Sequence, residues 1–151
     1  VFEHDREKYP FRYENFRRAD LEGWVRDGFE IGAHTVNHVN LGVCNLEESR
    51  FEIVESGAQL ERMIGQPVKL FSFPFGKVAD IRPEATAFIR EAGYSALFSA
   101  YGGFVGEDTS LWDIPRIGVS EEHLPMYLLL EIEGLTGPAL SSKLRKLLRR
   151  R

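Results

Sequence analysis

Two histidines with three residues between them stand in segment 34–38, which reads HTVNH. If this segment turns helically, the spacing brings both imidazoles to one cation, and imidazole nitrogen is a common zinc ligand. Catalytic zinc uses three protein ligands and an open position for water, so His34 and His38 predict a metal site that a third residue from elsewhere must complete. The alternative is that the two rings cap a helix or fill space, and spacing alone does not decide between the two interpretations.

A second candidate element follows a strand-like run. Residues 71–76 read FSFPFG, in which Pro74 and Gly76 flank Phe75. A proline and a glycine on either side of an aromatic residue force the backbone into a sharp, rigid turn, which can aim a backbone N–H at a fixed point. The alternative is an ordinary turn at the end of a strand, with its phenylalanines in the core.

The elements around these residues alternate between strands and helices. We expect an irregular connecting segment over 1–19, with Asp20 as the N-cap of the first helix, and a basic helix over 138–151. Strands separated by helices of about ten to twenty residues are typical of βα units with a parallel sheet, so an α/β layer or barrel follows. The expected strands are 29–33, 68–73, 95–99 and 115–119, and the expected helices are 20–28, 45–65, 83–92 and 124–132.

This order of elements places the candidate residues at one edge of the sheet. His34, the turn at 74–76 and the loop after Ser99 all follow expected strands. In parallel α/β folds, working residues collect at the carboxyl ends of the strands. Three candidate site elements therefore share one rim.

Composition narrows the class of protein. The 151 residues are 43% hydrophobic and 28% charged, which is sufficient for a single globular domain with a core. A net charge of −4 does not favour nucleic acid as a partner, and no apolar run approaches the roughly 20 residues that cross a bilayer. Cys44 is the single cysteine, so we expect a buried thiol. The chain opens with Val1, so we expect any targeting segment to lie upstream, and localisation stays open.

The two motifs together resemble a known family. Residues 28–38 (GFEIGAHTVNH) closely resemble the glycine, strand and His-Ser/Thr-x-x-His metal motif of the polysaccharide deacetylase family, the nodulation-protein-B homology domain of carbohydrate esterase family 4. Residues 73–76 (FPFG) resemble the proline-aromatic-glycine motif of that family. The resemblance runs from about Ala19 to Val119.

The resemblance implies a distorted (β/α) barrel that removes N- or O-acetyl groups from a polysaccharide. It implies a divalent metal, zinc first, with cobalt, nickel or manganese as alternatives, held by His34, His38 and an aspartate, while a second aspartate acts as base. The backbone N–H of Phe75 would stabilise the oxyanion, and Pro74, Phe75 and Gly76 would contact substrate. Both aspartates normally lie in a Thr-Phe-Asp-Asp type motif on the first strand, and these 151 residues contain no such motif.

We therefore expect a partial barrel that lacks its first βα units and is inactive alone. The alternative is a non-catalytic carbohydrate-binding or remnant domain of the same fold. Unpaired edges on the strands at 29–33 and 115–119 would favour self-association. The histidine at 123 is interpreted as an exposed residue at a helix start rather than as a general acid.

Arg116 and Trp112 are candidates for two family roles that the motifs above leave without a clear match. The family often has an arginine before the motif proline, where this chain has Ser72 and Phe73. Arg116 is a candidate for the missing orienting charge, because alternation along the strand at 115–119 would aim it inward. Its alternative is a surface ion pair with Asp113 or a glutamate. Trp112 loosely resembles a tryptophan of the substrate groove, although it fits the core equally well.

Overall fold

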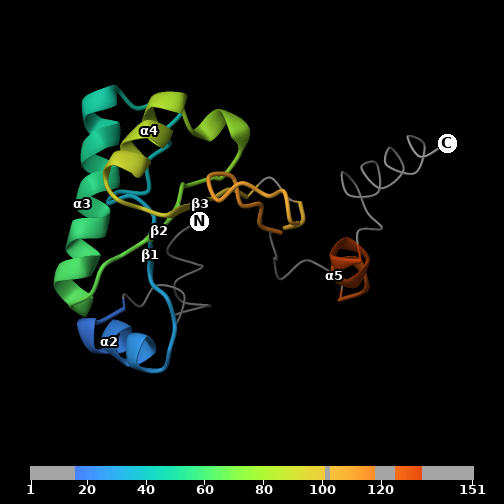
Figure 1. Ribbon diagram of the computed structural model, residues 1–151, viewed down its shortest axis with the longest axis horizontal. Coiled ribbons are helices and arrows are strands. Elements are labelled where there is room, and N and C mark those ends of the chain that lie inside the picture. The colour runs from blue at the N-terminus through green and yellow to red at the C-terminus, as the bar shows by residue number, and fades with distance from the viewer. Residues whose placement is uncertain (1–15, 101–102, 118–124, 134–151) are drawn as a thin grey trace, which may run out of the picture.

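Three short parallel strands form the centre of the fold. The computed structural model describes residues 16–100, 103–117 and 125–133 (Figure 1). Strands β1 (Gly32–Ala33), β2 (Leu70–Ser72) and β3 (Ala96–Phe98) lie in that order in one sheet, with Ala33 opposite Phe71 and Phe71 opposite Leu97. Neighbouring parallel strands need a crossover connection, and a helix supplies each one. The expected α/β order is therefore confirmed in this part of the chain.

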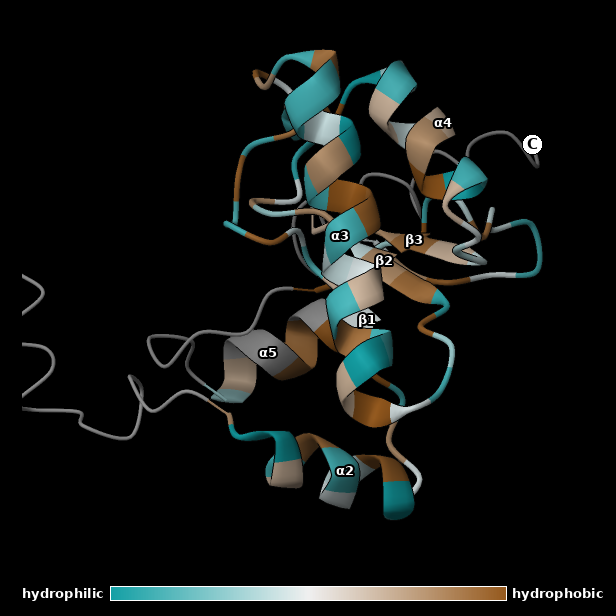
Figure 2. Ribbon diagram, turned by 90° about the vertical axis from the view of Figure 1, so that its left-hand side faces the viewer, coloured by the Kyte–Doolittle hydropathy of each residue, from teal (hydrophilic) through white to brown (hydrophobic). Residues whose placement is uncertain are grey.

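The helices that make these connections cover one face of the sheet. Helices α3 (Leu46–Ile64) and α4 (Pro83–Glu91) pack against each other in front of the strands in Figure 2, and α2 (Arg18–Arg26) packs against α3. Within the described residues, the remaining helices are the 3₁₀ turn η2 (Val78–Asp80) and α5 (Pro125–Ile132). The core between helices and sheet consists of Ala33, Leu41, Ile53, Val68, Phe71, Phe73, Ala85, Ile89, Tyr94 and Leu97. No helix of the described residues combines the length and the apolar character that crossing a bilayer requires.

Local capping signals explain where the helices begin and end. The side chain of Asn45 accepts a hydrogen bond from the Glu48 N–H at 2.8 Å, which caps α3 as expected. Gly28 and Gly93 follow α2 and α4 with φ of 89° and 87°. The N–H of Phe29 returns to the Trp24 carbonyl at 2.9 Å, so α2 closes with the bond pattern that favours a left-handed glycine.

The start of α2 differs from the expectation. The helix begins at Arg18, so it includes the last two residues of the segment 1–19 that was expected to be irregular. Asp20 was expected as the N-cap but lies in the first turn, where its carboxylate accepts a hydrogen bond from the Arg17 N–H at 2.8 Å. An acidic side chain at this position can satisfy a free N–H at the helix start as well as a cap residue can.

The expected strand at 115–119 was wrong over its described residues, 115–117, which have no regular structure. The extended pairing occurs one residue earlier, where Ile114 forms an isolated parallel bridge with Phe98. Arg116 bonds to the next acceptor along that segment, the Ser99 carbonyl, through its side chain rather than through its backbone N–H. The strand expected at 29–33 is limited to Gly32–Ala33 because Phe29 still bonds to α2.

Several sequence-based expectations fall outside the described residues. These are the basic helix over 138–151, the histidine at 123, and most of the connecting segment 1–19.

Cys44 lies within the described residues, and its thiol is buried as expected. Burial raises the pKa of this thiol, so the less reactive protonated form predominates at neutral pH.

Tyr94 supports a testable prediction about the core. Its hydroxyl donates to the Ile53 carbonyl at 2.9 Å, and burial raises the pKa of the phenol. We expect Tyr94→Phe to lower the free energy of unfolding by about 1 kcal/mol near neutral pH. A raised folded-state pKa stabilises the native state below the unfolded value of about 10 and loses that contribution as pH rises above it. Urea unfolding at about pH 7 and about pH 11 should therefore show the difference shrinking, and a constant difference would contradict the assignment.

Candidate active site

His34 and His38 lie against each other at the end of β1. Their ring centroids are 5.0 Å apart with an interplanar angle of 69°. The Nδ1 atom of His34 lies 2.6 Å from the backbone carbonyl oxygen of Ser72. A carbonyl only accepts, so Nδ1 carries the proton and Nε2 keeps its lone pair for a metal ion. This is the arrangement that proteins use to orient a metal-binding imidazole.

The segment between the two histidines does not form the helical turn that their spacing suggested. Thr35 and His38 instead adopt left-handed backbone conformations, with φ of 63° and 56°. Such conformations cost about 1 to 2 kcal/mol each in residues other than glycine. Strained backbone of this kind concentrates at functional sites, where the surrounding structure holds it.

The turn at Pro74-Phe75-Gly76 lies beside the histidine pair. The Gly76 N–H donates to the Pro74 carbonyl at 2.7 Å, and Phe75 has φ of 63°, which together make an uncommon, strained γ-turn. The exposed ring of Phe75 lies edge-on to His38, with centroids 5.2 Å apart. The Phe75 N–H has no hydrogen-bond partner among the described residues, so it remains able to donate to a bound ligand.

Arg116 reaches the same region from a loop rather than from a strand. Its Nε donates to the Ser99 carbonyl at 2.7 Å. Arg116 and His34 both line a pocket of about 350 Å³, together with Ser72 and Phe98. The structure therefore brings the guanidinium to the rim that carries His34.

The electrostatic surroundings favour a neutral His34. Partial burial lowers its pKa below the ordinary value of about 6.5, and the charges of His38 and Arg116 lower it further, against the opposing effect of the hydrogen bond to Ser72. A neutral imidazole is the form that binds metal ions. His34 is therefore already in its binding form at pH 7.

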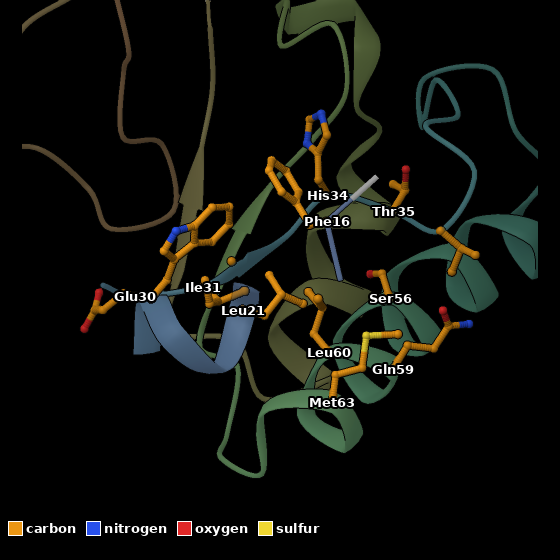
Figure 3. Close-up of a pocket in the computed structure, with 13 residues that line it drawn as sticks. Phe16, Leu21, Glu30, Ile31, His34, Thr35, Ser56, Gln59, Leu60 and Met63 are labelled. Carbon is orange, nitrogen blue, oxygen red and sulfur yellow. The ribbon is translucent and has the colours of Figure 1, made fainter. Parts of the chain in front are cut away.

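His34 also lines a second pocket, of about 490 Å³, on the other side of β1. Figure 3 shows His34 at one end of this pocket and Leu60 and Met63 at the other. The lining comes from α2, β1 and α3 and is largely apolar, with Leu21 and Ile31 as further contributors. His34 thus lines both pockets.

The structure does not bring Trp112 to the histidine pair. Trp112 packs against the hydrophobic core, with the guanidinium carbon of Arg90 4.3 Å from its ring centroid. It lines neither of the two pockets that reach His34. Its position agrees with the core interpretation, and its contact with substrate stays a prediction.

The residues present fit part of a metal site. His34 and His38 could supply two nitrogen ligands, and the Ser72 carbonyl already orients the first of these rings. Over residues 16–100, 103–117 and 125–133 there is no cluster of three His, Cys, Asp or Glu side chains suited to a metal ion. Since catalytic zinc sites use three protein ligands, a third must come from outside these residues.

The arrangement of strands and helices matches solved deacetylases. Deacetylase PplD from Streptococcus pyogenes, solved with acetate, aligns with a TM-score of 0.68 at 18% identity over 79% of this chain and 51% of that one. A Bacillus cereus polysaccharide deacetylase gives 0.66 at 18% identity over 80% and 37%. A de-N-acetylase from Aggregatibacter actinomycetemcomitans gives 0.64 at 13% identity over 77% and 53%. The chain thus has the (β/α) fold of these proteins in part and spans about half their length or less.

The sequence profile of the polysaccharide deacetylase family matches residues 7–97, more than half of the chain. The chain therefore belongs to the polysaccharide deacetylase family, which confirms the resemblance drawn from the two motifs. A search of curated proteins gave no match.

Proposed function

We propose that the domain to which this chain belongs removes acetyl groups from a polysaccharide in a metal-dependent hydrolysis. The observation that carries this proposal is the packing of the Phe75 turn against the His34–His38 pair at one rim of the sheet. Membership of the family supports the reaction class. Pro74, Phe75 and Gly76 form the surface beside the histidines that the acetylated sugar would contact.

His34 and His38 would hold the divalent ion through nitrogen. Zinc suits this donor set best, and cobalt, nickel and manganese also accept imidazole with carboxylate ligands. When bound, such an ion lowers the pKa of water toward 7 and polarises a carbonyl group. The Ser72 carbonyl holds the proton of His34 on Nδ1, which would leave Nε2 free to bind the ion.

The Phe75 N–H would donate to the oxyanion that forms on the acetyl carbonyl. The strained γ-turn fixes the direction of this N–H before substrate arrives. A preorganised donor of this kind contributes about 3 to 4 kcal/mol to transition-state stabilisation, because it needs no reorganisation during the reaction. Proton transfer from water would need a carboxylate base, which we place outside the described residues.

A second candidate function is carbohydrate binding without hydrolysis. The observation that favours it is the ligand count, since no carboxylate in the described residues joins the two histidines as a third ligand. A positioned general base contributes about 10²- to 10⁴-fold to rate, so residues 1–151 are expected to be inactive alone under either candidate.

The test compares two versions of the protein. Acetate release from an acetylated chito-oligosaccharide and from an acetylated xylan is measured for residues 1–151 and for a version extended upstream through an aspartate-bearing strand. We expect metal-dependent release only from the extended version, and the two substrates distinguish amide from ester cleavage. Equal, metal-dependent release by both versions would show that the base lies within residues 1–151. No release by either version would favour the binding domain.

Arg116 supports a separate prediction about the orientation of that base. A guanidinium near an aspartate lowers the pKa of the carboxyl by about one to three units and keeps it ionised. We expect Arg116→Met in the extended version to shift the acid limb of the pH–rate profile upward by about the same amount. Arg90→Met is the matched control, because Arg90 lies over Trp112 rather than beside His34. An unshifted pH–rate profile would contradict the orienting role and leave Arg116 with only its structural hydrogen bond to Ser99.

A further inference from the structure

One buried carboxylate touches the histidine segment directly. Glu52 lies in the middle of α3 and is only 2% exposed. Its Oε2 accepts hydrogen bonds from the backbone N–H groups of Val36 and Asn37 at 2.7 and 2.8 Å, and its Oε1 accepts from the Asn37 side chain at 2.6 Å. All three donors belong to the two residues before His38.

These contacts define the conformation of the segment. Two successive N–H groups can point at one oxygen only when the chain curls around it, as in the backbone nests that bind anions. The left-handed residues Thr35 and His38 lie on either side of this curl. A buried charge that lost its donors would leave an uncompensated carboxylate, so Glu52 strongly disfavours any other path for the segment.

We propose that Glu52 is the positioning residue that holds the His34 and His38 rings together. Glu52 is too buried to contact a substrate, and its two oxygens are engaged by Val36 and Asn37. It acts through the backbone between the histidines, with α3 as the rigid support. The inference rests on the proposed function only in one respect, the identity of the metal ion that the two rings would bind.

The sequence carries a weak signal for this residue. The buried face of α3 comprises Ser49, Glu52, Ile53, Ser56 and Gly57, in which Glu52 is the single charged member. A carboxylate on the inward face of an amphipathic helix needs partners from another element.

Glu61 provides a matched control on the same helix. Its Oε1 also accepts a backbone N–H, that of Val68 at 2.9 Å, but this bond lies at the far end of α3, before β2. A general effect of losing a helix carboxylate would therefore appear in Glu61→Gln as well, whereas a positioning effect on the histidines would appear only in Glu52→Gln.

The experiment measures the histidine segment itself by NMR in the 151-residue chain. For Glu52→Gln we expect the Val36 and Asn37 amides to exchange about 10- to 100-fold faster and the contact between the two imidazole rings to disappear. Asn37→Ala removes one donor from an exposed residue and should give a smaller loss of the same kind. The Ile53 amide reports global unfolding, and Glu61→Gln should change Val68 alone.

Unchanged exchange and ring contacts in both Glu52→Gln and Asn37→Ala would overturn the inference. If Glu52→Gln unfolds, Ile53 exchange will rise with it, and Asn37→Ala then decides. A titration of the upstream-extended protein with Co²⁺ alone adds a second readout, in which Glu52→Gln should weaken binding about 10- to 100-fold. Absence of Co²⁺ binding in that extended protein without the substitution, with the NMR result as expected, would count against the proposed function and leave Glu52 as the positioning residue.

Discussion

Replacing His34 with alanine is expected to lower acetate release by the upstream-extended protein on the order of 10³-fold or more. In the proposed mechanism a bound metal ion would contribute several kcal/mol of transition-state stabilisation, and each 1.36 kcal/mol corresponds to about tenfold in rate. His34 is exposed at the end of β1 and lies outside the core, but its side chain bonds to the Ser72 carbonyl. The free energy of unfolding should therefore fall by only about 1 kcal/mol, the contribution of one hydrogen bond.

The measurement is kcat/KM for acetate release, together with bound metal per protein. Replacing the histidine at position 123 with alanine serves as the control, because that residue is interpreted as an exposed helix-start histidine. We expect it to leave both quantities near those of the parent. Retained metal and rate in His34→Ala would remove the histidine pair from the mechanism, and a large loss at position 123 would restore it as a candidate general acid.

Gly76→Ala is expected to destabilise the fold strongly. A Cβ built on Gly76 would lie 2.3 Å from the Cβ of Ala100 and 2.7 Å from its backbone nitrogen. The backbone there cannot move freely, because the Ala100 N–H donates to the Gly76 carbonyl at 2.8 Å. We expect a loss of about 2 to 5 kcal/mol in the free energy of unfolding, from a left-handed alanine and from overpacking together.

Gly65 allows these two contributions to be separated. Its φ is 71° against 73° for Gly76, but no atom lies within 4 Å of a Cβ built on it. Gly65→Ala should therefore cost only the conformational part, about 1 to 2 kcal/mol. Urea unfolding of the two variants measures the difference. Equal losses would show that the segment at Ala100 yields to the added methyl group and that Gly76 is needed only for its φ.

The sequence predicted those parts of the fold that depend on local signals. Asn45 and Gly65 bound α3, and Gly93 follows α4, because capping residues act on the turn they belong to. Family membership was also predictable, because the motifs at 28–38 and 73–76 are short and specific. The strand expected at 115–119 was not found in its described part, where Arg116 bonds to the Ser99 carbonyl through its side chain rather than through the backbone, a contact that the apolar pattern does not indicate.

The geometry of the candidate site depended on contacts that no local pattern carries. Thr35, His38 and Phe75 have positive φ, which is rare for β-branched and bulky residues such as Thr and Phe. Groups distant in the sequence hold such conformations. Glu52, for example, is sixteen positions from Val36 and fifteen from Asn37, from whose backbone N–H groups it accepts hydrogen bonds. The placement of Arg116 near His34 was expected for the wrong reason, because a loop rather than a strand carries it there.

The hydrogen bond between His34 and Ser72 also determines when the rim can assemble during folding. It joins residues 38 positions apart, and the parallel pairing of β1 with β2 spans a similar separation. Closing such long loops costs chain entropy and slows folding, because the stabilising contacts form only after the two ends meet. Helix α3, whose backbone hydrogen bonds are local, can begin to form much earlier. The two imidazoles therefore come together late in folding, when β1 pairs with β2. During refolding, any metal uptake by these rings should follow helix formation as a separate, slower phase.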